Sequence, residues 1–184
     1  MSAITESFRA LEHAWPGVAG VRNPLRPPRA DAARVLETAL SVRPEAAALE
    51  WWGMHDGQAT GPVEGLFLQA FRLLSIDGAV AERASILQVM EDLGEQDSGF
   101  VHDSWLPIAV SGSRTILLDV LSGGVHSRDV VEWDAEGSIA SLEELLRLWG
   151  EGLHRGLWDK AISVDEWLAR RRGTGLGDDA LLFV

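Results

Sequence analysis

The segment 105–124, WLPIAVSGSRTILLDVLSGG, constrains the fold of this chain more than any other. Its two apolar runs are separated by Ser-Gly-Ser and closed by Ser-Gly-Gly, and both tripeptides favour tight turns between antiparallel strands. The second run is apolar on both faces, which is typical of a central strand covered on both sides. The pattern predicts strands over 106–110, 115–121 and 125–133, followed by a turn at 134–137.

Helical periodicity surrounds this strand-rich segment. Apolar spacing predicts helices over 3–14, 44–52, 76–93 and 142–153, and another helix that begins after Asp31 as its N-cap. Pro44 either ends that helix or begins the next one. Ser141 and Glu144 form a capping-box pattern. The segment 65–74 fits a strand or a helix, and the cap-like Ser75 that follows it favours a strand.

The order of these elements indicates the fold class. Helices come first, an antiparallel meander follows, and a helix closes the chain, which predicts a single α+β domain with a sheet packed by N-terminal and C-terminal helices. Four prolines within 16–29 predict an extended connector. Residues 164–172 are expected to add a short helix, and the apolar residues 180–184 are expected to dock onto the body.

Charge and composition narrow the possible functions. The 184 residues include no cysteine, which excludes disulfides and thiolate metal sites and fits a reducing cytoplasm. Neither a signal peptide nor a membrane-spanning segment is expected. The net charge is −12, and residues 50–110 hold ten acidic residues against two arginines. This charge disfavours nucleic-acid binding. It either keeps the protein soluble or attracts a basic protein partner.

The residues that could carry chemistry do not form a known catalytic pattern. The five histidines do not have metal-ligand spacing, and no phosphate-binding glycine loop or nucleophile elbow is present. We therefore expect no enzyme, cofactor or metal. Asp119 lies within an apolar strand, so its carboxylate needs either a hydrogen bond to a nearby turn or a ligand. Trp105 is interpreted as a core anchor, with a groove contact as the alternative, and Pro107 as marking a strand start or edge.

Several short motifs occur in a definite order over about residues 25–150. They are Leu25-Arg26-Pro27-Pro28, Trp51-Trp52-Gly53-Met54-His55-Asp56-Gly57, Phe71-Arg72-Leu73-Leu74-Ser75, Trp105-Leu106-Pro107-Ile108, Leu117-Leu118-Asp119, Gly124-Val125-His126 and Ser141-Leu142-Glu143-Glu144-Leu145-Leu146. This order resembles the SUKH superfamily, the Smi/Knr-type immunity and regulatory proteins. The resemblance makes 25–156 a SUKH-like domain, preceded by an N-terminal helix and linker, 1–24, and followed by an extension, 157–184.

The resemblance also implies a function. Its motif positions are Asp56, Gly57, Trp105, Pro107 and Asp119. It implies a non-catalytic protein that binds another protein, most simply a bacterial immunity protein that neutralises a polymorphic toxin such as a nuclease. The alternative is an interaction hub that regulates cell-wall or envelope processes. The candidate partner surface is an acidic band made of Glu91, Asp92, Glu95, Asp97 and Asp103.

Overall fold

A computed structural model describes residues 2–14, 25–58, 71–95, 101–129 and 136–157, together with Glu166, Ala169, Arg170 and Phe183. Its helices are α1 (Ala3–Ala14), α2 (Ala32–Leu40), α3 (Ala46–Met54), α4 (Ile76–Leu93) and α5 (Leu142–His154). Its strands are β1 (Arg72–Leu73), β2 (Trp105–Ser111), β3 (Arg114–Asp119), β4 (Val125–Asp129) and β5 (Glu136–Ile139).

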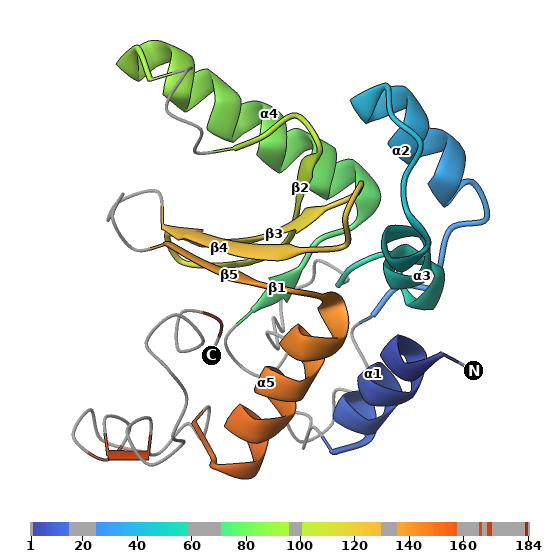
Figure 1. Cartoon of the computed structure of the whole chain (residues 1–184), viewed down its shortest axis with the longest axis vertical. Coiled ribbons are helices and arrows are strands. Elements are labelled where there is room, and N and C mark those ends of the chain that lie inside the picture. Colours follow the sequence, from blue (N-terminus) through green and yellow to red (C-terminus); the bar gives the residue numbers. More distant parts are fainter. Residues whose placement is uncertain are drawn as a thin grey trace.

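The strands form one antiparallel sheet in the order β1-β2-β3-β4-β5, so each strand pairs with its sequence neighbour. Helix α4 lies on one side of this sheet and α5 on the other, and α1 packs beside α5 (Figure 1). Helices α2 and α3 follow each other at one end of the molecule. The α+β class with a meander packed by helices is therefore confirmed.

The helix limits follow from local chemistry. Ser75 accepts a hydrogen bond from the Gly78 N–H at 3.0 Å, and α4 ends at Gly94 in the left-handed conformation. Ser141 accepts from the Glu144 N–H at 3.2 Å, as the capping-box pattern predicts. The Glu144 carboxylate reaches back to the N–H of Ala140, one residue before the cap. These contacts satisfy backbone donors that a helix start leaves free.

Two helix predictions need correction at their ends. Asp31 stands at the N-cap position of α2, but its side chain makes no capping hydrogen bond. Its carboxylate instead pairs with the guanidinium groups of Arg29 and Arg34, at 3.0 and 2.7 Å. Helix α3 begins two residues later than predicted and continues through Gly53 to Met54. Leu40 ends α2, four positions before Pro44, so the proline does not terminate that helix directly.

The sheet contains one strand that the sequence pattern did not reveal. Residues 134–137 were predicted as a turn, but Glu136 and Gly137 open β5 and pair with Arg128 and Ser127 of β4. The strand has only four residues, which is too short for alternation to show. The predicted strand at 65–74 is confirmed at Arg72–Leu73, while 65–70 lie outside the described residues.

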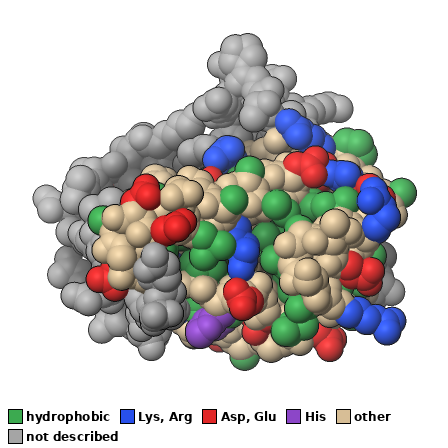
Figure 2. Space-filling model, turned by 90° about the horizontal axis from the view of Figure 1, so that it is seen from above, with side chains coloured by type: hydrophobic (Ala, Val, Ile, Leu, Met, Phe, Trp, Pro, Cys, Tyr) green, Lys and Arg blue, Asp and Glu red, His purple; other side chains and the backbone are tan. Residues whose placement is uncertain are grey.

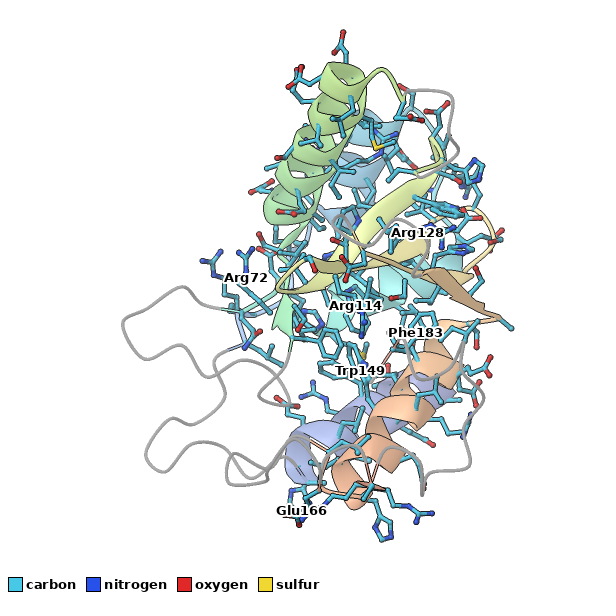
Figure 3. The ribbon with its side chains drawn as sticks, turned by 90° about the vertical axis from the view of Figure 1, so that its left-hand side faces the viewer. Arg72, Arg114, Arg128, Trp149, Glu166 and Phe183 are labelled. Atoms are coloured by element: carbon cyan, nitrogen blue, oxygen red, sulfur yellow. The ribbon has the colours of Figure 1, made fainter. Side chains whose placement is uncertain are left out.

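One hydrophobic core joins helices from both ends of the chain to the sheet. Phe8 of α1 contacts Trp51 of α3 edge-on at 5.7 Å, and Trp149 of α5 stacks on Phe71 at 5.3 Å. Phe183 lies in the same core, where its carbonyl accepts a 2.9 Å hydrogen bond from the Trp149 indole. Figure 3 shows Phe183 and Trp149 together between the sheet and α5. The expected docking of the C-terminal residues is confirmed at Phe183.

Candidate protein-binding surface

The motif pair Asp56 and Gly57 joins the end of α3 to the start of α4. The Asp56 carboxylate accepts from the Ile76 N–H at 3.0 Å, at the first residue of α4. Gly57 has φ +68°, and a Cβ at this position would overlap the backbone of Leu74 and Ser75. The Gly57 carbonyl also accepts from the Arg26 N–H at 2.8 Å. Both residues therefore hold elements together rather than face a ligand.

Trp105 is buried, with 6% of its surface exposed, but it lies outside the main core cluster. Its ring stacks on His126 at 3.7 Å, meets His102 edge-on at 4.5 Å, and has the Arg128 guanidinium carbon 5.0 Å from its centroid. Trp105 belongs to β2 and His126 to β4, so the indole crosses β3 between them. It covers the sheet above Leu117, which is fully buried.

Trp105 therefore anchors a smaller cluster of rings that lies outside the main core cluster. Pro107, two residues after Trp105, is also buried, at a position where β1 does not extend along β2. The register between β2 and β3 shifts between Pro107 and Ala109, so a bulge admits Ile108 as an extra core residue. Proline fits here because no ladder hydrogen bond from β1 is lost.

The Asp119 carboxylate closes the turn between β3 and β4. One oxygen accepts from the Leu121 N–H at 2.9 Å and the other from the Ser122 hydroxyl at 2.6 Å. Partial burial raises the pKa of Asp119, but hydrogen bonds from Ser122, Leu121 and Ser104 outweigh it and lower the pKa below 3.8. The expected bond to a neighbouring turn is confirmed, and the carboxylate is occupied within the fold.

His55 is buried in the core beside α1. Its Nδ1 accepts the Gly57 N–H at 3.0 Å, which leaves the proton on Nε2, and its ring stacks on Phe8 at 5.0 Å. Burial lowers its pKa from 6.5 to about 4. Nε2 and the indole nitrogens of Trp51 and Trp52 are buried and have no hydrogen-bond partner among the described residues. His55 is thus a neutral core residue at pH 7.

The acidic band is only partly brought together by the fold. Glu91 and Asp92 occupy the last turn of α4, and Glu95 follows its C-cap; all three are exposed. Asp103 lies nearer the sheet, with its carboxylate 3.6 Å from the Arg83 guanidinium. Asp97 falls outside the described residues. Figure 2 shows acidic side chains across the face that carries α4, and on its left they are not accompanied by Lys or Arg side chains.

Asp92 accepts a 2.9 Å hydrogen bond from the Gln88 side chain one turn earlier, but the charge of these acids is unfavourable for the end of the helix where they stand. The carboxyl end of a helix carries partial negative charge and is stabilised by cations. The last turn of α4 contains no basic residue, and Glu91 and Asp92 stand there instead. The same types of residue at the start of α5, Glu143 and Glu144, do favour their helix. The helix dipole therefore does not favour the acidic end of α4.

Sequence reasoning did not identify the apolar side chains beside these acids. Leu87, Val89 and Leu93 of α4 are 37, 46 and 57% exposed. In the sequence they continue the helical periodicity and look like core positions. Only the outward projection of the second half of α4 explains their exposure, because within that half Ile86 and Met90 alone are buried, against Val101.

Two other kinds of site, a pocket and a metal site, are less well supported by the structure than the exposed end of α4. A hollow of about 430 Å³ lies between α1 and α5 and is lined mainly by small and apolar side chains, such as Ala10, Leu146 and Gly150. In the part of the chain that the structure describes, no three His, Asp or Glu side chains form a group able to hold a metal ion. Nor is any described helix both long and apolar enough to span a bilayer.

The architecture is thus that of an α+β protein with an acidic, partly apolar helix end directed away from its sheet. Comparison with known proteins finds no protein-family model and no curated protein that matches the chain.

Proposed function

We propose that this protein is a non-catalytic, cytoplasmic binding protein of the SUKH type, which neutralises a toxin by binding it. The observation that supports the proposal most directly is the exposed acidic end of α4, made of Glu91, Asp92 and Glu95. Carboxylates at the negative end of a helix oppose its dipole, and a partner that brings positive charge to this end would offset that cost.

The other motif positions support the same choice of surface. Asp56, Gly57 and Asp119 make hydrogen bonds within the fold, and Trp105 is covered by His126 and Arg128. These contacts show that the motif residues stabilise the fold. In the acidic band, by contrast, Glu91, Asp92 and Glu95 lie exposed on the surface. A toxin that binds nucleic acid carries a basic cleft, and an acidic surface would occupy that cleft and exclude the substrate.

The test is an affinity purification from the natural host, followed by binding measurements on the recovered partner. We expect one stoichiometric, basic protein that is toxic when expressed alone and harmless when co-expressed with this chain. Its affinity should fall as salt rises from 50 to 200 mM, because charge attraction is screened. A spread of substoichiometric envelope proteins would instead indicate an interaction hub.

A charge-reversal variant locates the surface. Changing Glu91, Asp92, Glu95 and Asp97 to lysine should weaken binding at least about 100-fold and remove most of its salt dependence. The matched control reverses four exposed glutamates elsewhere, Glu6, Glu37, Glu45 and Glu143, and so has the same net charge. The control should bind far more tightly than the first variant. Equal affinity and salt dependence for the acidic-band variant and the natural chain would refute this surface.

A further inference from the structure

The second half of α4 exposes apolar side chains on two different flanks. Among the described residues, four large hydrophobic side chains are exposed, and three of them are Leu87, Val89 and Leu93. The fourth, Leu121, lies in the turn between β3 and β4. Scattered single exposures are ordinary on a protein surface, whereas these three lie within seven residues of one helix end, beside its acidic side chains.

The helical repeat fixes the order of these side chains around the axis. Successive residues are rotated by about 100°. Measured from Leu87, Glu91 then lies at about 40°, Asp92 at about 140°, Val89 at about 200° and Leu93 at about 240°. The two acidic residues thus form a ridge, with Leu87 along one side of it and Val89 and Leu93 along the other.

The buried side of the helix lies between these flanks. Ile86 and Met90 fall at about 260° and 300° on the same scale, and both are buried. The exposed aliphatic groups are therefore the two edges of the apolar stripe of α4, uncovered because this half of the helix projects past the sheet (Figure 1). A partner that touched only the outer face would contact the ridge and leave both edges in water.

We infer that the distal half of α4 inserts into a cleft of its partner, a basic protein whose cleft has a cationic floor and apolar walls. This inference rests on the proposed function and adds the shape and chemistry of the partner's site. The floor meets Glu91 and Asp92, while one wall covers Leu87 and the other covers Val89 and Leu93. The aliphatic contacts lose their water on binding and contribute affinity that salt does not screen. The acidic residues attract the basic partner and orient it as it approaches.

Alanine variants separate the apolar contribution from the charged one. The triple variant Leu87→Ala, Val89→Ala, Leu93→Ala should weaken binding of the purified partner by about 10-fold to 100-fold and leave the slope of affinity against salt unchanged. The control Leu121→Ala removes an equally exposed leucine and should change affinity less than twofold. Because the three side chains are exposed, thermal unfolding should show all variants folded.

Cysteine labelling distinguishes a cleft from a flat contact. The chain has no cysteine, so Leu87→Cys and Leu93→Cys each introduce a single thiol. In a cleft, the partner should slow alkylation of both thiols at least about 10-fold, whereas a flat contact protects at most one flank. Leu121→Cys should react at the same rate with and without the partner.

The outcomes separate the two proposals. If charge reversal weakens binding but the triple alanine variant and both thiols are unaffected, the cleft inference is wrong and the acidic binding surface stands. If charge reversal has no effect, or no stoichiometric partner exists, both proposals are wrong.

Discussion

A buried histidine makes the stability of this protein depend on pH. His55 is fully buried among aromatic rings, and its Nδ1 is already used as an acceptor for the Gly57 N–H. Burial holds its pKa at about 4 in the folded state against 6.5 in the unfolded chain. The unfolded state therefore binds the proton first as pH falls, and protonation favours unfolding.

The resulting prediction concerns the range from pH 7 to 5. His55 should lower the free energy of unfolding by about 2 kcal/mol over this range, since its stabilising effect is complete only above its unfolded pKa. Urea unfolding of the natural chain and of His55→Asn, measured at both pH values, isolates this contribution. Asp31, Asp119 and Glu151 have pKa values lowered from 3.8, 3.8 and 4.5, so the stability they contribute is lost mainly as pH falls below these values, outside the range tested. An equal pH-induced loss in both proteins would contradict the prediction.

Single residues were predictable where their chemistry left few choices. A carboxylate at the end of an apolar strand and before Ser-Gly-Gly must find nearby donors, and Asp119 does so. Trp105 was predicted to be buried, and it is, but its partners were not evident. Its contacts with His126 and Arg128 depend on strand register, which brings residues more than twenty positions apart together.

At the scale of elements, the contact between Gly57 and the entrance of α4 decides how α3 and α4 are joined. Gly57→Ala should destabilise the protein by about 3 kcal/mol or more, because the Cβ meets backbone atoms and φ is +68°. Gly53→Ala is the matched control. It lies within α3 with open space around it, and should stabilise by about 0.5–1 kcal/mol. Chemical denaturation of the two variants measures both values, and similar stabilities would refute this role of Gly57.

Element limits were predictable where a cap or a turn marks them. Ser75, Gly94 and Ser141 mark the ends of α4 and α5 in the sequence and in the structure. The limits of the shortest strands were not predictable in the same way: β1 was predicted only within the longer strand 65–74, and the start of β5 was predicted as a turn. The two residues of β1 and the four of β5 are strands because β2 and β4 already provide partners, so their conformation depends on tertiary contacts more than on their own composition.

At the scale of the whole molecule, the core is closed by residues from both ends of the described chain. Phe8 and Phe183 are almost fully buried in the same cluster as Trp149. Phe183→Ala should lower the free energy of unfolding by about 3–5 kcal/mol, as large-to-small core changes do. Leu121→Ala, at an exposed turn, should change it by less than about 0.5 kcal/mol. A small effect of Phe183→Ala in urea unfolding would mean that Phe183 does not close the core.

The acidic part of the candidate binding surface was predicted from the sequence, and its apolar part was not. The acidic residues between Glu91 and Asp103 can be counted directly, but their grouping required the end of α4 to be located. The apolar flanks could not be predicted, because Leu87 and Leu93 have the spacing of core residues. Whether such residues are buried depends on how far the helix runs past the sheet, and that length is a property of the assembled molecule.

The position of Phe183 and Phe8 in one core also bears on how the protein emerges from the ribosome. The five strands can pair in the order in which they are made, because each neighbour in the sheet is the next strand in the sequence. Helix α1 is made before α5 and packs against it, although more than one hundred residues separate the two helices. The part of its apolar face that meets α3 can be covered early, but the part that meets α5 stays uncovered until α5 has been made, and chaperones bind apolar surface of this kind on newly made chains.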